Sequence, residues 1–223
     1  MKTLQNYIIE KILINKNSKI VYNYYPKTKD ELEDIIDKRI ESEGNKCNLN
    51  DIDTSYITDM SYLFEDSEFN GDISKWNVSN VTNMEYMFRF SKFNGDISKW
   101  DVSNVENMNY MFLHSTFNDD ISKWNMSNVT NMKSMFAHSN FNGDISNWDV
   151  SNVENMRYMF AWSKFNDNIS NWDVFNVTNM ECMFAWSKFN SNISKWDVSN
   201  VRDKSYMFVN CPIEKKYKPK FKR

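Results

Sequence analysis

The side chains of this sequence with the greatest capacity for chemistry are two histidines, three cysteines and a recurring set of aspartates. His114 and His138 have the same surroundings, since each follows a Met-Phe pair by two positions. Catalysis or metal binding needs a convergent set, in which a cysteine, carboxylate or serine lies beside a positioned base. No such motif accompanies either histidine, so the sequence predicts that the protein is not an enzyme and binds neither a metal nor another cofactor.

The cysteines and the N-terminal residues bear on the cellular compartment. The cysteines are Cys47, Cys182 and Cys211. Their odd number and their spacing fit neither a disulfide framework nor a metal site, so we expect reduced thiols. Glu10 and Lys11 interrupt the apolar N-terminal run before a signal peptide or a membrane span could form. The sequence therefore predicts a cytoplasmic protein without a membrane span.

Aspartates recur in two series, at the interval that separates the two histidines or at twice that interval. One series is Asp72, Asp96, Asp120 and Asp144, continued by Asn168 and Asn192, and the other is Asp101, Asp149, Asp173 and Asp197. Stacked carboxylates could hold Ca²⁺, which takes several oxygen ligands. The alternative, which we favour, is that each Asp or Asn caps a turn of its own backbone.

One further position changes from copy to copy while its surroundings stay fixed. Its aromatic members are Phe90, His114, His138, Trp162 and Trp186. Aromatic anchors dominate the contact energy of many interfaces, so an exposed column would suit a protein partner or, alternatively, a glycan. If the column is buried, it covers the core instead. A second variable series, of alternating charge, is the other candidate contact site: Glu85, Asn109, Lys133, Arg157 and Glu181.

The histidines, the aspartates and the two variable series belong to one tandem repeat, whose full copies begin at Phe69, Phe93, Phe117, Phe141, Phe165 and Phe189. The first full copy, FNGDISKWNVSNVTNMEYMFRFSK, occupies residues 69–92, and the others follow it without insertion. A degenerate copy, LNDIDTSYITDMSYLF, precedes it at residues 49–64. A unit of this size cannot bury its own apolar side, so neighbouring units must stack.

The spacing of apolar residues changes within each unit. In the first full copy Trp76 and Val78 indicate a short strand or extended turn. Val81, Met84 and Phe88 then have the spacing of one helical face. We therefore predict an α/β fold, a right-handed solenoid of strand–turn–helix coils.

Other repeated positions indicate the core and the turns. Six tryptophans share one position and are expected to be core rungs: Trp76, Trp100, Trp124, Trp148, Trp172 and Trp196. Two asparagine columns, which begin at Asn70 and Asn80, are expected to bond to one another and cap backbone groups between coils. Gly71 and its counterparts, which give way to Asp or Ser in three copies, suggest a turn tolerant of positive φ rather than a position that allows no side chain.

The segment before the repeats predicts an N-terminal cap. Thr28 and Glu31 form a capping-box motif, and we expect a helix over residues 29–42 that Gly44 closes. Farther upstream, residues 8–14 and 20–25 flank KNSK and suggest a hairpin, with a helix as the alternative for the first segment. The predicted organisation is a hairpin and capping helix at 1–48, a repeat solenoid at 49–212 with its degenerate coil at 49–68 and six full coils from 69, and a basic tail at 213–223.

The charge distribution argues against nucleic acid as a partner. The net charge is −3, yet residues 213–223 carry six Lys or Arg and one Glu, so the rest of the chain is acidic. Phosphate binding needs a basic face, which such a body does not provide.

The repeated residues FNGDISKWDVSNVTNM…MF and the preceding LNDIDTSYITDMSYLF resemble the BspA-like leucine-rich-repeat surface-protein family of bacteria and some microbial eukaryotes and viruses. The resemblance covers about residues 26–219. It implies leucine-rich-repeat-like coils. It also implies the cell surface as the alternative location, because members are often displayed there and some are linked to adhesion to host matrix proteins.

Together these features predict a noncatalytic repeat protein that mediates macromolecular recognition, of the protein-binding or adhesion type, through a protein partner that the sequence does not identify. The alternatives are a structural scaffold or self-assembling element and, more remotely, an enzyme. The sequence leaves open whether the protein is a monomer or a homo-oligomer.

Overall fold

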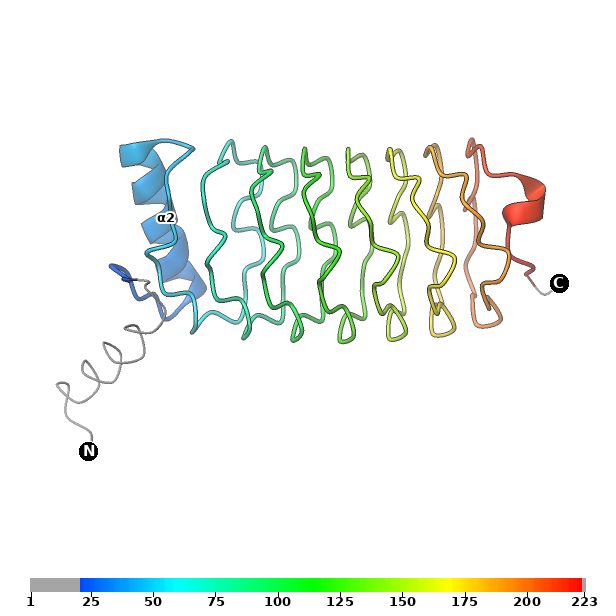
Figure 1. Cartoon of the computed structure of the whole chain (residues 1–223), viewed down its shortest axis with the longest axis horizontal. Helices are drawn as coiled ribbons and strands as arrows, with labels where there is room; N and C mark the ends of the chain where they lie inside the picture. The colour runs from blue at the N-terminus through cyan, green and yellow to red at the C-terminus, as the bar shows by residue number, and fades with distance from the viewer. Residues whose placement is uncertain (1–20, 222–223) are drawn as a thin grey trace, which may run out of the picture.

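The computed structural model describes residues 21–221, and within them two helices lie at opposite ends of a long stack of coils (Figure 1). These are the α-helix α2, Lys29–Glu43, and the 3₁₀ turn η1, Lys215–Tyr217. Neither has the length and apolar character that crossing a membrane requires. The first segment of the predicted hairpin lies outside the described residues, and in its second segment Tyr24 forms an isolated parallel bridge with Ile52.

The prediction of a capping helix is confirmed, with a small change in its N-terminal bonds. The Thr28 hydroxyl oxygen accepts the Glu31 N–H at 3.2 Å, as a capping box requires. The Glu31 carboxylate reaches one residue farther back than expected and accepts the N–H of Lys27 at 2.6 Å. Gly44, with φ of 85°, ends the helix in the left-handed region, where glycine has no steric penalty.

Along one side of the stack, successive coils are joined by backbone hydrogen bonds. The N–H groups of Met84, Tyr86, Phe88 and Phe90 donate to carbonyl oxygens of the next coil at 2.8–2.9 Å. Between these bonds, tight turns close within the coil, as where Met87 N–H donates to the Met84 carbonyl at 3.3 Å. The result is a parallel ladder of single bridges, without a continuous strand in residues 21–221.

The helix that we predicted within each repeat is wrong. Tyr86 and Phe90 have φ values of 59° and 55°, and each is the third residue of a hydrogen-bonded turn, which is the geometry of a type II turn. Left-handed residues cannot continue a right-handed helix. Consecutive tight turns direct Met84 and Phe88 inward, so they satisfy the apolar spacing that suggested a helix.

The same two positions are left-handed in every coil, although none of them is glycine. They are Tyr62, Asp66, Tyr86, Phe90, Tyr110, His114, Ser134, His138, Tyr158, Trp162, Cys182, Trp186, Tyr206 and Asn210. This conformation costs a non-glycine residue roughly 1–2 kcal/mol. The regular ladder of hydrogen bonds therefore overrides the local preference of these residues.

On the opposite side of the stack, side chains make the recurring contacts between the full coils. The Trp124 indole N–H donates to the Ile97 carbonyl at 3.1 Å, and equivalent bonds form at all six repeat tryptophans. Asn118 N–H donates to the Asn94 side-chain oxygen at 2.7 Å, and such bonds recur along this asparagine column. The asparagine columns thus link coils as predicted.

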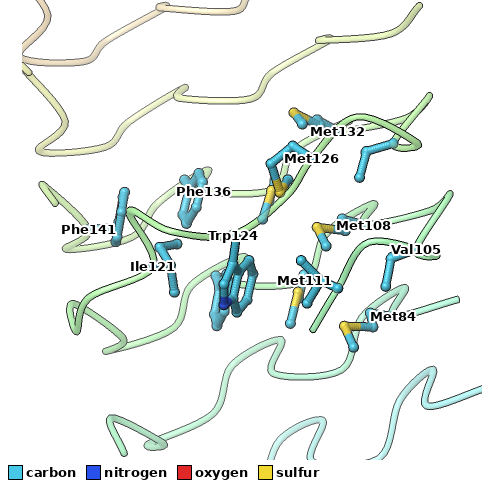
Figure 2. Close-up of a cluster of buried hydrophobic side chains, with 14 of the residues drawn as sticks. Met84, Val105, Met108, Met111, Ile121, Trp124, Met126, Met132, Phe136 and Phe141 are labelled. Atoms are coloured by element: carbon cyan, nitrogen blue, oxygen red, sulfur yellow. The ribbon is translucent and has the colours of Figure 1, made fainter. Parts of the chain in front are cut away.

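The interior of the stack is filled by the same side chains from every coil. Figure 2 shows the central part, where Trp124 lies among Ile121, Met111 and Met126. The repeat tryptophans are 3–5% exposed, which confirms them as core residues. Buried phenylalanines stack on their equivalents in the next coil, as Phe88 does on Phe112 at 5.6 Å between ring centroids.

The expectation about the turn at Gly71 needs correction. Gly71 does not have a positive φ. The glycine with a positive φ is Gly44. Glycine is needed at 71 because a Cβ would collide with the Cys47 carbonyl oxygen. The segment expected to be a basic tail folds over the last coil, where Ile213 is buried and the Tyr217 carbonyl accepts the N–H of Ile193 at 3.0 Å.

Candidate functional site

The variable aromatic column forms an exposed, continuous stack of rings, called here the aromatic strip. It consists of Phe90, His114, His138, Trp162 and Trp186. All five side chains are exposed, and Phe90, Trp162 and Trp186 reach 40–42%. Ring centroids of successive members lie 4.1–4.7 Å apart, with planes within 16° of parallel. The alternative in which this column is buried in the core is therefore wrong.

The backbone fixes the position of each ring in the strip. Trp162 N–H donates to the Ala185 carbonyl at 2.8 Å, so the residue is held in the ladder between coils. The residues on either side, Ala161 and Ser163, are buried at 0% and 2% exposure. Each aromatic ring therefore projects from a rigid, buried support.

A second column of aromatic residues, which sequence reasoning missed, lies four residues before the strip. Tyr62, Tyr86 and Tyr110 stack at 4.8 and 4.5 Å, and Tyr158 stacks on Trp162 of the strip at 6.4 Å. Burial, followed by the neighbouring Tyr110, raises the pKa of Tyr86 to about 12. The recurrent Tyr before each Met-Phe pair was the available signal, but Ser134 and Cys182 interrupt it.

The spacing between equivalent rings shows that the coils fan out across the stack. It is 4.1–4.7 Å in the strip, 5.6–5.9 Å in the buried series that contains Phe88, and 6.2–6.5 Å in the series of Phe93 and Trp76. Direct backbone bonds draw the coils together on the strip side, because they hold chains about 4.8 Å apart. Intervening side chains separate the coils on the other side. The aromatic strip therefore lies on the concave face.

Charged side chains border the strip on both sides. Two residues after a strip ring, Lys92, Lys164 and Lys188 are exposed, and none of them makes an ion pair with another residue of the described range. On the other border, which is the charged series predicted as a second candidate, Arg157 pairs with Glu181 at 2.7 Å. The lysines are thus free to meet an external anion.

The two histidines lie in the centre of the strip, with their rings 4.1 Å apart. Burial lowers the pKa of both from the ordinary value of about 6.5, and His114 lowers that of His138 further. They stack on each other and on Phe90 and Trp162, so neighbouring rings cover both faces of each imidazole.

This stack predicts a pH-dependent stability. The folded pKa values of the two histidines lie below the unfolded ones, so the unfolded chain binds protons more readily than the folded protein. The stability that is present above about pH 6.5 is therefore lost as the pH falls through the folded pKa values. We expect the melting temperature to fall over this interval. In His114→Phe/His138→Phe, which keeps the aromatic stack, the fall should be smaller. An equal fall in the two proteins would contradict this assignment.

The aspartate series caps turns, as we favoured. Asp144 accepts the N–H of Ser146 at 2.9 Å and its hydroxyl at 2.7 Å, and these bonds hold the pKa of the Asp144 carboxyl below its ordinary value. The same side-chain-to-backbone bond recurs at Asp72, Asp96, Asp120, Asn168 and Asn192. Within residues 21–221 no cluster of three His, Cys, Asp or Glu side chains could hold a metal ion. All three cysteines are free, and Cys47 and Cys182 are buried.

Fold and site define a tandem-repeat protein, in which a regular aromatic pattern builds both the core and an exposed face. A family model described as "Mycoplasma protein of unknown function, DUF285" matches residues 32–140 and again residues 113–219. The chain belongs to this family, which is a repeat family of the kind that the sequence resemblance indicated. No curated protein and no solved structure matched the chain.

Proposed function

We propose that this protein is a noncatalytic recognition protein, and that its aromatic strip binds a protein partner on the concave face of a right-handed, leucine-rich-repeat-like solenoid of the BspA type. The observation that carries the proposal is the unbroken row of exposed rings from Phe90 to Trp186. Contiguous exposed apolar side chains on a soluble repeat protein mark interaction surfaces.

The rigidity of the strip supports the same proposal. Side chains that must be immobilised at an interface cost about 0.5–1.5 kcal/mol each. Here the rings are already ordered by stacking on one another, and the backbone beneath them is held by hydrogen bonds such as Trp162 N–H to the Ala185 carbonyl. A partner would therefore meet a preorganised surface.

The identity of the residues also supports a binding role. Glycine would adopt the left-handed conformation of this column without strain, whereas aromatic residues adopt it at a cost. Phe90, Trp162 and Trp186 are nevertheless found there and are exposed to solvent, where they add little to the core. Their presence is accounted for if their rings make contacts outside the chain.

Self-assembly is the second candidate, and it would also give these rings a partner. Growth of the stack end to end is opposed by the two caps, since α2 covers one end and residues 213–221 cover the other (Figure 1). A dimer through the strip remains the form of self-assembly to test.

We place the protein in the cytoplasm on the basis of its free thiols, with the cell surface as the alternative that follows from the resemblance.

The test is capture of a partner from native cell extract by the immobilised full chain. Trp162→Ser/Trp186→Ser should capture at least about tenfold less partner, because aromatic hot spots carry most of the binding energy. Its stability should stay within about 1 kcal/mol of the parent, since exposed substitutions have small effects. Phe175→Ser is the matched control, because Phe175 is 48% exposed but replaces the serine found at this position in other coils.

Three results would contradict the proposal. Unfolding of the double variant would make the strip a structural element. Undiminished capture by a stable double variant would move the contact site to the charged series of Glu85, Asn109, Lys133, Arg157 and Glu181. A strip-dependent, concentration-dependent dimer in sizing experiments, with no captured partner, would support self-assembly instead.

A further inference from the structure

The aromatic strip presents ring edges to the solvent rather than ring faces. The inner members His114, His138 and Trp162 each have a nearly parallel ring on both sides, at 4.1–4.7 Å between centroids. Nucleic acid bases bind aromatic residues by stacking on their faces. Sugars likewise place their C–H groups against the electron-rich face of a ring. Because neighbouring rings already cover these faces, neither kind of ligand can stack along the inner part of the strip.

The edge of an aromatic ring has the opposite electrostatic character to its face. The quadrupole of the ring makes its edge positive, so exposed edges attract carboxylate and carbonyl oxygens. The edges of the five rings form one continuous row on the concave side of the stack. A row of this kind favours a ligand rich in oxygen acceptors, with apolar groups that can fill the space between them.

The charges around the strip have the matching sign. Lys164 and Lys188 are exposed and unpaired within the described residues, and they follow Trp162 and Trp186 by two positions in adjacent coils. On the other border the Glu181 carboxylate is neutralised by Arg157. The half of the strip nearer the C-terminus is therefore positive, although the chain as a whole carries a net charge of −3.

We infer that the aromatic strip and its bordering lysines bind an acidic polypeptide segment, in which carboxylates alternate with apolar side chains. The carboxylates would meet Lys164 and Lys188 and the positive edges of Trp162 and Trp186, and the apolar side chains would fill the space between these contacts. This inference rests on the proposed function and adds the chemical class of the partner. An acidic polypeptide also fits the exclusion of stacking ligands, because its recognition needs no open ring face.

The experiment measures binding of defined probes to the full chain by fluorescence anisotropy. The principal probe is a short labelled peptide of repeated Glu-Leu-Asp-Ser, and its matched control is the peptide of repeated Gln-Leu-Asn-Ser. A labelled single-stranded oligothymidylate and a labelled β-linked glucose oligosaccharide represent the stacking ligands. The acidic peptide should bind, and higher salt should weaken its binding, because exposed charge pairs are screened. The other three probes should bind at least about tenfold more weakly.

Charge reversal locates the binding on the protein. In Lys164→Glu/Lys188→Glu the affinity for the acidic peptide should fall about tenfold, as two exposed attractions become repulsions. Lys123→Glu/Lys195→Glu makes the same change in net charge at two exposed lysines of the other half of the coil, and it should leave the affinity unchanged. Trp162→Ser/Trp186→Ser should also weaken binding of the acidic peptide. Circular dichroism should show each variant to be folded.

Each alternative outcome overturns the inference in a distinguishable way. The Gln-Leu-Asn-Ser peptide could bind as tightly as the acidic peptide and lose its binding in the tryptophan variant but not in the lysine variant. That result would indicate a neutral apolar partner and leave the proposed function intact. If only the oligonucleotide or only the oligosaccharide bound, and bound through the strip, the partner would belong to that class of molecule rather than to the polypeptides. Binding of no probe would overturn the inference, and strip-dependent capture from extract would then decide the proposed function separately.

Discussion

Trp124→Ala should lower the free energy of unfolding by about 3–5 kcal/mol. Trp124 is 3% exposed at the centre of the stack, its ring lies 6.4 Å from that of Phe112, and its indole N–H donates to the Ile97 carbonyl. The substitution removes a large ring from a close-packed interior and leaves a buried carbonyl without its donor. A loss of this size is a large fraction of the stability of an ordinary domain. Urea denaturation followed by circular dichroism measures it.

Two further variants separate the causes of this loss. Trp124→Phe keeps most of the volume but removes the N–H, so it should show an intermediate loss of about 1–3 kcal/mol. Phe175→Ser removes an aromatic ring that is 48% exposed, and its effect should stay within about 0.5 kcal/mol. An unchanged melting temperature for Trp124→Ala would show that the Trp124 ring and its hydrogen bond to the Ile97 carbonyl do not stabilise the stack.

Leu32→Asp/Ile36→Asp should detach α2 and convert the protein into concentration-dependent oligomers. Both side chains are buried, at 0% and 2% exposure, against the first coil. Burying two unpaired carboxylates costs several kcal/mol, so the helix is expected to leave the stack instead. Its departure uncovers Leu49 and Ile52 together with the backbone edge of the coil, which is a template for pairing with another chain.

Sizing chromatography with light scattering, over a range of protein concentrations, measures this effect. Lys38→Asp introduces the same residue on the exposed side of α2 and is the control, for which we expect the oligomeric state of the parent. A monomeric double variant with the parental melting temperature would show that α2 does not protect the end of the stack.

The parts of the fold that were predictable from the sequence depend on repeated burial or on local capping. The helix α2 follows from Thr28, Glu31 and Gly44, whose effects are confined to the residues around them. The core position of Trp124 follows from its recurrence in every full coil. In contrast, the path of Val81 to Phe88 depends on hydrogen bonds to the next coil, and an apolar spacing cannot distinguish a helix from a series of tight turns.

The candidate site was predictable in its residues but not in its geometry. The residues from Phe90 to Trp186 vary while the rest of the repeat stays constant, and this variation identified the strip. Its exposure depends on left-handed turns that no residue type in the sequence predicts. Glycine is the usual signal for such a turn, and here the position holds aromatic residues. The tyrosine column gave a weaker signal than the repeat tryptophans, because Ser134 and Cys182 interrupt it.

The near-identity of the coils has a consequence for how the chain folds and evolves. Any coil can stack on any other, so a folding chain can pair coils out of register and loop out one whole repeat unit. The closure entropy of such a loop is only about 3 kcal/mol plus a constant. Few contacts identify the correct neighbour, among them the ion pairs of Arg89 with Glu65 and of Arg157 with Glu181. The same property lets the gene gain or lose whole coils by recombination between repeats. Gain or loss of a coil that carries a strip ring would lengthen or shorten the aromatic strip by one ring.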